Sequence, residues 1–414
     1  MGSFPEYPYQ FFFDESAGDT PPGPVAPPVP ALPRPQEASA QFSPAYLSPA
    51  AWTSYHDRFS ADIGGGVYPR VLGRDTGARM YRVRKLGADG EFATITQALA
   101  QWNADKQGSA APRTAVIEVA DSATYHEAPQ FRLAPGEHLQ LRAASMVRPV
   151  LRMFDYGSGV PEQIRICGAP GSRLTLDGLL VAGGGIAIDD GDDADGSSLA
   201  GFHVTFRHCT LVPDWEPESI GQSPWRGKPS VMLRAAGVAL RVDHSIVGPI
   251  RVASGARTTL HVGDSIIDAG HAAGLAISDA RYGAAHAIAS FVRATVIGLA
   301  QVQELVLAEN SLFLGPLLAA RRHLGSVRFC YLEQGSRTPR REYCQPDLAL
   351  ENRGVELLRP RFLSLRYGTP GYCQLAHDCA LEISCGGDDD AAMGAFHDQL
   401  QPSAAAHGAG CQIA

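Results

Sequence analysis

One short pattern recurs along the middle of this chain. Residues 241–270 carry it twice, because Asp-His-Ser-Ile-Val at 243–247 returns as Gly-Asp-Ser-Ile-Ile at 263–267. Other copies share the same order of features: an alternating strand, a polar break, a small residue and a second aliphatic strand. They lie at 174–183, 204–213, 289–298 and 305–315, and a further copy is predicted at 326–335. Anchored at the small residue, the copies stand 16 to 35 residues apart, at Gly178, Thr210, Ser245, Ser265, Thr295, Ser311 and Cys330.

A repeat near twenty residues that consists only of strands and turns cannot bury an apolar face alone. Stacking successive copies in parallel solves this, because each strand pairs with its equivalent one coil above and below while aliphatic residues fill the lumen. The variable spacing then corresponds to loops expelled from some turns. Leucine-rich repeats need a different Leu/Asn pattern, and propeller blades are longer. The sequence therefore predicts an all-β fold: a right-handed parallel β-helix (solenoid) with a short N-terminal capping helix.

Composition narrows the function classes. The net charge of −8 argues against a general affinity for nucleic acid. The longest apolar stretch, 298–320, contains Glu304, Glu309 and Asn310, so we expect no membrane span. The first residues lack the basic and apolar regions of a secretory signal, which favours cytoplasmic synthesis, followed by release only within a complex or particle. In that setting the cysteines are expected as reduced thiols packed in the interior.

The chain divides into four parts. Residues 1–36 form an aromatic, proline-rich tail, 37–88 a lead-in, 89–335 the β-helix, and 336–414 the final coils with Arg-rich loops and a C-terminal cap. In the tail, Tyr9, Phe11, Phe12 and Phe13 precede a polyproline-like stretch at 21–35. An aromatic group on a stiff spacer predicts a docking peptide for a protein partner. The alternative is a tail that folds back on its own domain.

The start of the predicted solenoid resembles pectin methylesterase-type right-handed β-helices. Residues 89–99 read Asp-Gly-x-Phe-x-Thr-Ile-x-x-Ala-Leu and are followed by Val-Ile-x-Val at 116–119 and Tyr-His-Glu at 125–127. The resemblance implies a capping helix, for which Thr94 or Thr96 is the N-cap, and a first coil. The catalytic aspartate and glutamine motifs of that superfamily are missing from the sequence, so no catalytic residue is carried over and an enzyme is the less favoured expectation.

The C-terminal part resembles bacterial β-helix proteins from gene clusters for phage-tail-like particles, including contractile injection systems. The stretches that carry this likeness are GSRTPRREYCQPDLAL (335–350), RPRFLSLRYGTPGYCQLA (359–376) and GGDDDAAMGAFH (386–397). The resemblance implies a particle component rather than a free enzyme.

Three surface features are candidate sites. An acidic loop could bind calcium, although a solvated turn is the simpler explanation; its residues are Asp189, Asp190, Asp192, Asp193 and Asp195. A Pro/Gly-rich loop carries Trp215, Trp225 and Arg226, which suit a carbohydrate or protein partner; the alternative is a loop folded over the solenoid wall that buries both indoles. Residues 321–366 hold ten arginines against five acids, a charge of +5, and Arg337, Arg340 and Arg341 are the densest group. They either contact a partner or tie down loops through carboxylates.

Together these features predict a non-catalytic structural or adhesin-like component of a phage-tail-like particle, docked to its partner through the N-terminal tail. The alternative is a polysaccharide-active enzyme, a lyase or esterase, or a carbohydrate-binding module on the same solenoid. For a lyase, calcium at the acidic loop and a basic residue such as Arg226 would be needed.

Overall fold

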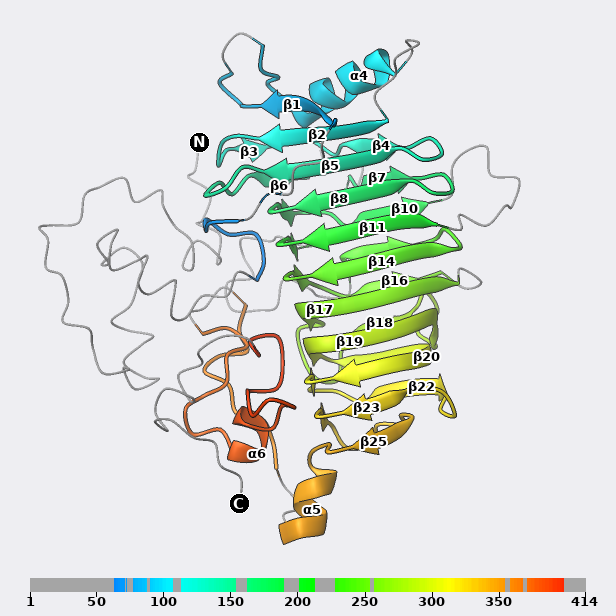
Figure 1. Ribbon diagram of the computed structural model, residues 1–414, viewed down its shortest axis with the longest axis vertical. Coiled ribbons are helices and arrows are strands. Elements are labelled where there is room, and N and C mark those ends of the chain that lie inside the picture. Colours follow the sequence, from blue (N-terminus) through cyan, green and yellow to red (C-terminus); the bar gives the residue numbers. More distant parts are fainter. Residues whose placement is uncertain are drawn as a thin grey trace, which may run out of the picture.

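The computed structural model describes residues 63–70, 72, 77–87, 90–106, 113–153, 162–189, 201–212, 228–253, 257–353, 358–367 and 371–397. Within these ranges the chain is all-β, with parallel strands stacked coil upon coil along one long axis (Figure 1). Each coil contributes up to three strands, which form three parallel sheets. The sheets are continuous at some corners because β17 (Thr258–Asp268), β19 (Ala285–Ile297) and β20 (Leu299–Glu309) run from one sheet into the next.

Sheet 1 is the longest stack. Its strands are β1 (Arg79–Val83), β2 (Thr114–Val119), β5 (His138–Ala143), β8 (Arg173–Asp177), β11 (Phe202–Arg207), β14 (Val238–Asp243), the first half of β17, most of β19, the second half of β20, β23 (Ser326–Arg328) and β25 (Arg340–Glu342). The stack thus begins at β1, within the predicted lead-in, and continues past residue 335.

Sheets 2 and 3 complete the coils with shorter strands. Sheet 2 contains β3 (Thr124–Tyr125), β6 (Val150–Arg152), β9 (Leu180–Ala182), β12 (Thr210–Val212), β15 (Ile246–Val247), the second halves of β17 and β19, β21 (Leu312–Phe313) and β24 (Tyr331–Leu332). Sheet 3 contains β4 (Gln130–Arg132), β7 (Ile164–Cys167), β10 (Ile186–Asp189), β13 (Val231–Leu233), β16 (Ile250–Val252), β18 (Leu275–Asp279), the first half of β20 and β22 (Leu317–Arg321).

The lumen is filled by aliphatic and aromatic side chains in register. One row of fully buried residues crosses sheet 1 through Leu141, Leu176, Phe206, Val242, Val262 and Phe291. It belongs to a single core cluster that extends from Tyr81 to Cys344. Because a parallel strand places alternate residues inward, the period-two pattern of the sequence becomes this continuous interior.

A helix, α4 (Ile95–Asp105), lies beside β1 and β2 at one end of the stack (Figure 1). The Thr94 side chain accepts a hydrogen bond from the Gln97 backbone N–H at 3.1 Å, so Thr94 is the N-cap, one of the two residues that the sequence offered. Ile95, Leu99 and Trp102 are buried on its inner face. Two shorter helices, α5 (Asp347–Arg353) and α6 (Leu381–Ser384), follow the last described coils.

A row of alternating charges sets the register of sheet 1. The residue near the end of each strand faces its equivalent one coil away, and the order is Arg82, Glu118, Arg142, Asp177, Arg207, Asp243, Gly263, Val292, Glu309, Arg328 and Glu342. Arg142 lies 2.8 Å from Glu118, and Arg328 lies 2.6 Å from Glu309. A slip by one coil would oppose like charges, so we call this the charge row and infer that it fixes the pairing. Gly263 and Val292 interrupt it.

The corner between sheets 1 and 2 has its own repeated geometry. One residue per coil has a positive φ, and this corner row comprises Gly178, His208, His244, Asp264, Arg293, Asn310, Phe329 and Tyr343. A buried small residue often follows, and its side chain satisfies backbone groups: Ser265 Oγ accepts from the Ser245 N–H, and Ser311 Oγ accepts from the Ala294 N–H, both at 3.0 Å. The structure shifts three predicted anchors by one position, to Leu179, Cys209 and Ala294, whereas Ser245, Ser265, Ser311 and Cys330 occupy it as predicted.

The outer face of sheet 2 is covered by two segments, one that precedes the solenoid in the sequence and one that follows it. Outward-facing apolar side chains such as Leu180, Ile246 and Ile266 pack against Ile63, Tyr367, Tyr372, Cys373, Ala395 and Phe396. Figure 1 shows the blue segment near residue 65 and the orange-red segment with α6 on this same flank. Tyr372 anchors the cover, because its hydroxyl donates to the buried Asp268 carboxylate at 2.5 Å. Sheet 2 is therefore an internal layer, while the outer face of sheet 1 remains accessible.

No helix in the described part of the chain is long and apolar enough to cross a membrane. The cysteines agree in part with the expectation of reduced thiols. Six of the cysteines among the described residues are outside any disulfide, namely Cys167, Cys209, Cys330, Cys344, Cys373 and Cys379. Cys385 differs, because it is disulfide-bonded.

Candidate functional site

The interruption of the charge row at Gly263 is the most distinctive polar site on sheet 1. A methyl group in place of the missing side chain would lie 3.4 Å from Asp243 Oδ1 and 3.5 Å from His261 Nε2. Both polar atoms therefore face the space that Gly263 leaves open. Asp243 comes from β14, and His261 lies two residues before Gly263 on β17.

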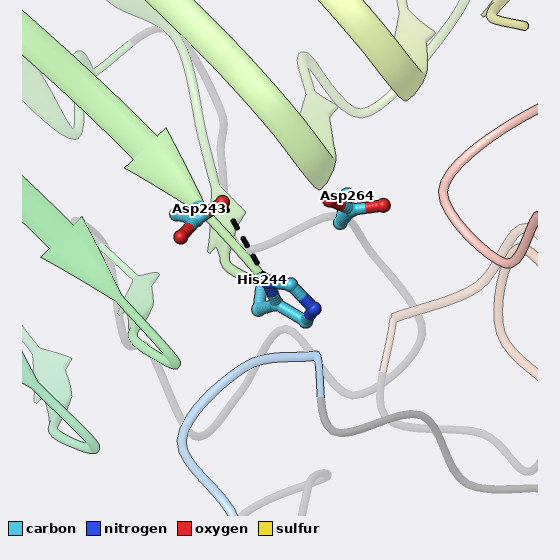
Figure 2. A group of neighbouring side chains, drawn as sticks. All are labelled: Asp243, His244 and Asp264. Atoms are coloured by element: carbon cyan, nitrogen blue, oxygen red, sulfur yellow. Dashed lines mark ion pairs between the residues drawn. The ribbon is translucent and has the colours of Figure 1, made fainter. Parts of the chain in front are cut away.

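The adjacent corner row brings two carboxylates and a histidine together. Figure 2 shows Asp243, His244 and Asp264 around the end of β14 and the corner in the middle of β17, and their nearest ligand atoms all lie within 4.8 Å of one another. His244 Nδ1 is 3.6 Å from Asp243 Oδ1, an ionic contact longer than a hydrogen bond. His244 and Asp264 occupy equivalent corner positions of successive coils, with φ of 45° and 46°.

Arginines neutralise both carboxylates of this group. Arg293 binds Asp264 through two hydrogen bonds of 2.5 and 2.8 Å, and Arg241 lies 3.4 Å from Asp243. Burial alone would raise the pKa of Asp243, but the His244 ring and the Arg241 charge outweigh it and hold that pKa at about 2. The carboxylate of Asp243 is thus ionised throughout the physiological range.

The chain segment at 63–70 shields one side of the group. The Gly64 N–H donates to the His244 carbonyl at 2.8 Å, and the Tyr68 hydroxyl lies 3.2 Å from His208 Nδ1. The His208 and His244 rings are 5.1 Å apart. His244 is therefore held between its corner neighbours, which favours a fixed structural position.

His261 is the most promising chemical group beside the gap. Its Nδ1 lies 2.7 Å from Ser290 Oγ, which belongs to the facing residue of β19. Burial and the Arg241 charge lower the pKa of His261, although Asp243 and Asp264 act in the opposite direction. The ring is therefore neutral at pH 7, as a general base must be.

The arrangement can bind and orient a hydroxyl or carboxyl group. Asp243 accepts hydrogen bonds, Arg241 donates them, and the neutral His261 ring does either according to its tautomer. A serine, a histidine and a carboxylate are also the components of nucleophilic catalysis. Here, within the described residues, His261 bonds to Ser290 but not to Asp243, so the geometry supports recognition more directly than covalent catalysis.

The residues predicted from sequence do not gather at this site. Asp189 lies at the end of β10 on sheet 3, where it forms a 3.0 Å ion pair with Arg234. The other calcium candidates, Asp190, Asp192, Asp193 and Asp195, lie outside the described residues. So do the loop residues Trp215, Trp225 and Arg226 and the tail residues Tyr9, Phe11, Phe12 and Phe13.

The arginine group lies on the last described coils. Arg341 on β25 binds Asp347 at 2.9 Å, Thr338 Oγ1 at 2.9 Å and the Ser336 carbonyl at 2.7 Å. It therefore ties down a loop, as the pairing alternative expects. Arg340 differs, because its side chain is 82% exposed and its contact is a 3.0 Å pair with the neighbouring Glu342. Arg337 is also exposed.

Sequence reasoning missed the gap at Gly263, although the repeat that begins the sequence analysis contains it. Asp243-His244-Ser245 aligns with Gly263-Asp264-Ser265. The exchange of Asp for Gly at the first position was the available signal, but its meaning depends on the charges in coils far away in sequence.

No family model, no curated protein and no solved structure matches this chain.

Proposed function

We propose that this chain is a non-catalytic structural or adhesin-like component of a phage-tail-like particle. The supporting observation is the single uninterrupted core from Tyr81 to Cys344 beneath the paired charge row. A solenoid of this kind is stiff because every coil is packed and hydrogen-bonded on both sides. The self-covered sheet 2 and the accessible sheet 1 then give the rod one closed and one open flank.

In this proposal the fold is a right-handed β-helix of the pectin methylesterase type without its catalytic motifs, and α4 closes its N-terminal end. The protein is synthesised in the cytoplasm and leaves it only with the particle. The tail residues Tyr9 and Phe11 to Phe13 dock to a protein partner. Exposed arginines at the other end, Arg337 and Arg340, provide a second contact, to which the Trp215 and Trp225 loop contributes.

The test is capture of a stoichiometric partner by the tagged full-length chain from native lysate, identified by mass spectrometry. A variant with Phe11→Ala, Phe12→Ala and Phe13→Ala is compared with wild type, and Leu86→Ala is the control because Leu86 is 92% exposed elsewhere. We expect a tube or baseplate protein with wild type and the control, and its loss with the triple variant. Equal results for all three chains would refute the docking role of the tail.

The gap at Gly263 favours a second candidate, recognition or turnover of an acidic polysaccharide on the outer face of sheet 1. Beside the gap, half-buried and exposed polar residues form a row across successive strands: Gln140, Thr175, Thr205, Arg241, His261 and Ser290. Such a row presents polar groups at the regular spacing of neighbouring strands, which suits an extended polysaccharide chain. Turnover by a lyase would add calcium at Asp189 to Asp195 as a cofactor.

Binding and cleavage are distinguished by one set of measurements. Wild type, His261→Gln and the control His203→Gln, which changes an exposed histidine of β11, are tested on an array of acidic polysaccharides with and without calcium. Retention that only His261→Gln weakens supports a binding face, and calcium-dependent product release supports an enzyme. If none of the polysaccharides is retained or cleaved, this second function is excluded for the glycans tested.

A further inference from the structure

A second histidine–carboxylate group lies on the cover of sheet 2, far in sequence from the gap at Gly263. It consists of Asp388, Asp389 and His397, whose nearest ligand atoms all lie within 4.8 Å of one another. Donor atoms bound to one zinc ion at about 2.0–2.2 Å stand roughly 3–4 Å apart. Asp388 and Asp389 are exposed, so modest rotations of their side chains close the set.

The histidine of this group is held in the orientation of a metal ligand. The His397 side chain is only 4% exposed, and its Nδ1 lies 2.7 Å from the Ala392 carbonyl oxygen. That carbonyl can only accept, so Nδ1 donates to it, and Nε2 is turned towards Asp389, whose Oδ1 is 3.2 Å away. Metal-bound histidines are typically fixed in this way by a backbone carbonyl behind the ring.

One of the carboxylates is also held from behind. The Asn310 side-chain amide donates to Asp388 Oδ1 at 2.6 Å, and the Asp388 backbone N–H donates to Asn310 Oδ1 at 3.1 Å. Asn310 belongs to the corner row and also accepts the Gly394 N–H through its backbone carbonyl at 2.7 Å. Asp388 is therefore oriented by the solenoid rather than by its own loop.

This group differs from the one at the Gly263 gap in the charged residues that surround it. There, Arg293 binds both oxygens of Asp264, and Arg241 contacts Asp243. Among the described residues, neither Asp388 nor Asp389 has an ion pair with arginine or lysine. Within the part of the chain that the structure describes, no arginine or lysine therefore competes with a divalent cation for these two carboxylates.

We propose that Asp388, Asp389 and His397 bind a divalent first-row transition ion, with zinc as the reference, through His397 Nε2 and one carboxylate oxygen from each aspartate. One nitrogen with two carboxylates suits these ions better than calcium or magnesium, which take oxygen donors. The ion would clamp the loop at 387–397 onto the corner row through Asp388 and Asn310. This inference does not depend on the function proposed above.

The experiment uses the full-length chain after removal of metal with a chelator. Zinc binding is measured by calorimetry, and Co²⁺ binding by visible absorption, whose intensity reports the coordination geometry. Asp388→Asn and Asp389→Asn are compared with Asp390→Asn, an exposed neighbour outside the group whose φ of 61° asparagine tolerates. Asp264→Asn tests the other group. We expect one zinc per chain, at least tenfold weaker binding in the first two variants, and wild-type affinity in the last two.

Three results would overturn the proposal. One is the absence of zinc and cobalt binding to wild type at pH 7.5. Another is binding that Asp389→Asn leaves unchanged or that Asp264→Asn abolishes, because the ion would then belong to a different group. The third is calcium binding of equal affinity with the same dependence on Asp388 and Asp389, since that result removes the need for His397. Because both aspartates are exposed, their variants are expected to fold, and circular dichroism checks this.

Discussion

Replacing Arg70 with methionine tests how the segment at 63–70 is fastened to the solenoid. Arg70 is 8% exposed and fills the corner that Gly178 leaves without a side chain, where an added methyl group would lie 1.5 Å from Arg70 Nη1. Its Nη2 donates to the carbonyl oxygens of Ala143, Ala144 and Val147 at 3.3, 2.7 and 3.1 Å. Beneath it lies Asp177, 2% exposed.

Two losses add up in Arg70→Met. Hydrogen bonds from a charged donor contribute about 1.5–3 kcal/mol, and the three carbonyls share one nitrogen, so we count them once. Removing a cation beside a buried carboxylate costs up to ~3–5 kcal/mol when the two are in direct contact. Arg70 does not hydrogen-bond Asp177 within the described residues, so this second loss is smaller. We expect the free energy of unfolding at pH 7 to fall by about 3 kcal/mol.

The pH dependence identifies the carboxylate. Burial raises the pKa of Asp177, while Arg70, Arg207 and Arg142 lower it. A carboxyl whose pKa is higher in the folded chain than in the unfolded chain favours folding when protonated, and this contribution is lost as pH rises through the folded pKa. Without Arg70 that pKa rises further. The deficit of Arg70→Met should therefore be largest at pH 7 and shrink as pH falls towards 4.5.

Denaturant unfolding at pH 4.5 and 7, followed by circular dichroism, measures both effects. In Arg70→Met/Asp177→Asn the pH-dependent part of the deficit should disappear. A deficit that is the same at both pH values, or that Asp177→Asn does not change, would show that Arg70 does not act through Asp177. Gly178→Ala adds a steric test with Gly335→Ala as its control, because both glycines have positive φ but nothing lies within 4 Å of a methyl group at Gly335. Only Gly178→Ala should displace Arg70, and its loss in free energy of unfolding should approach that of Arg70→Met.

Two further predictions concern sheet 1 and the last coils. Arg241→Gln should raise the pKa of His261 and Asp243→Asn should lower it, because Arg241 lowers that pKa and Asp243 raises it. An NMR titration of the imidazole resonances measures both shifts. Shifts of the same sign in the two variants would contradict the electrostatic assignment. Arg341→Ala should reduce the free energy of unfolding by about 1–2 kcal/mol, whereas Arg340→Ala should leave stability unchanged and weaken partner capture, and the opposite order would exchange their roles.

The sequence was sufficient to predict the stacked parallel strands, since each copy of the repeat carries its own strand period and corner. It could not fix every corner to the residue. Cys209 and Thr210 are both small and adjacent, and only the 3.0 Å bond between the Cys209 N–H and Ser245 Oγ places Cys209 in the corner. Ala294 likewise occupies the corner in place of the adjacent Thr295, because the Ala294 N–H donates to Ser311 Oγ. These choices depend on hydrogen bonds between coils, which a linear pattern does not contain.

The polar groups were harder to predict for the same reason. Asn310 and Asp388 meet although 78 residues separate them, because the chain returns along the flank after the last coils. Nothing in the local sequence of Asp388 to Asp390 distinguishes a solvated turn from a cation site. The proposed cation site depends on His397 and the carbonyl behind its ring, which the fold brings to the loop.

The position of the gap in the charge row follows from what surrounds it. Elsewhere in the row Arg142 pairs with Glu118 and Arg328 pairs with Glu309 across neighbouring coils, and such paired side chains have little capacity left for a ligand. At Gly263 and Val292 the row contains no charge, and the compensation moves to the corner, where Arg293 pairs with Asp264. Asp243 therefore faces Gly263 rather than a charged side chain of the next coil, and His261 faces the same open space. In the binding function proposed above, the ligand would therefore meet sheet 1 where the alternation of charges stops, which is the site beside His261.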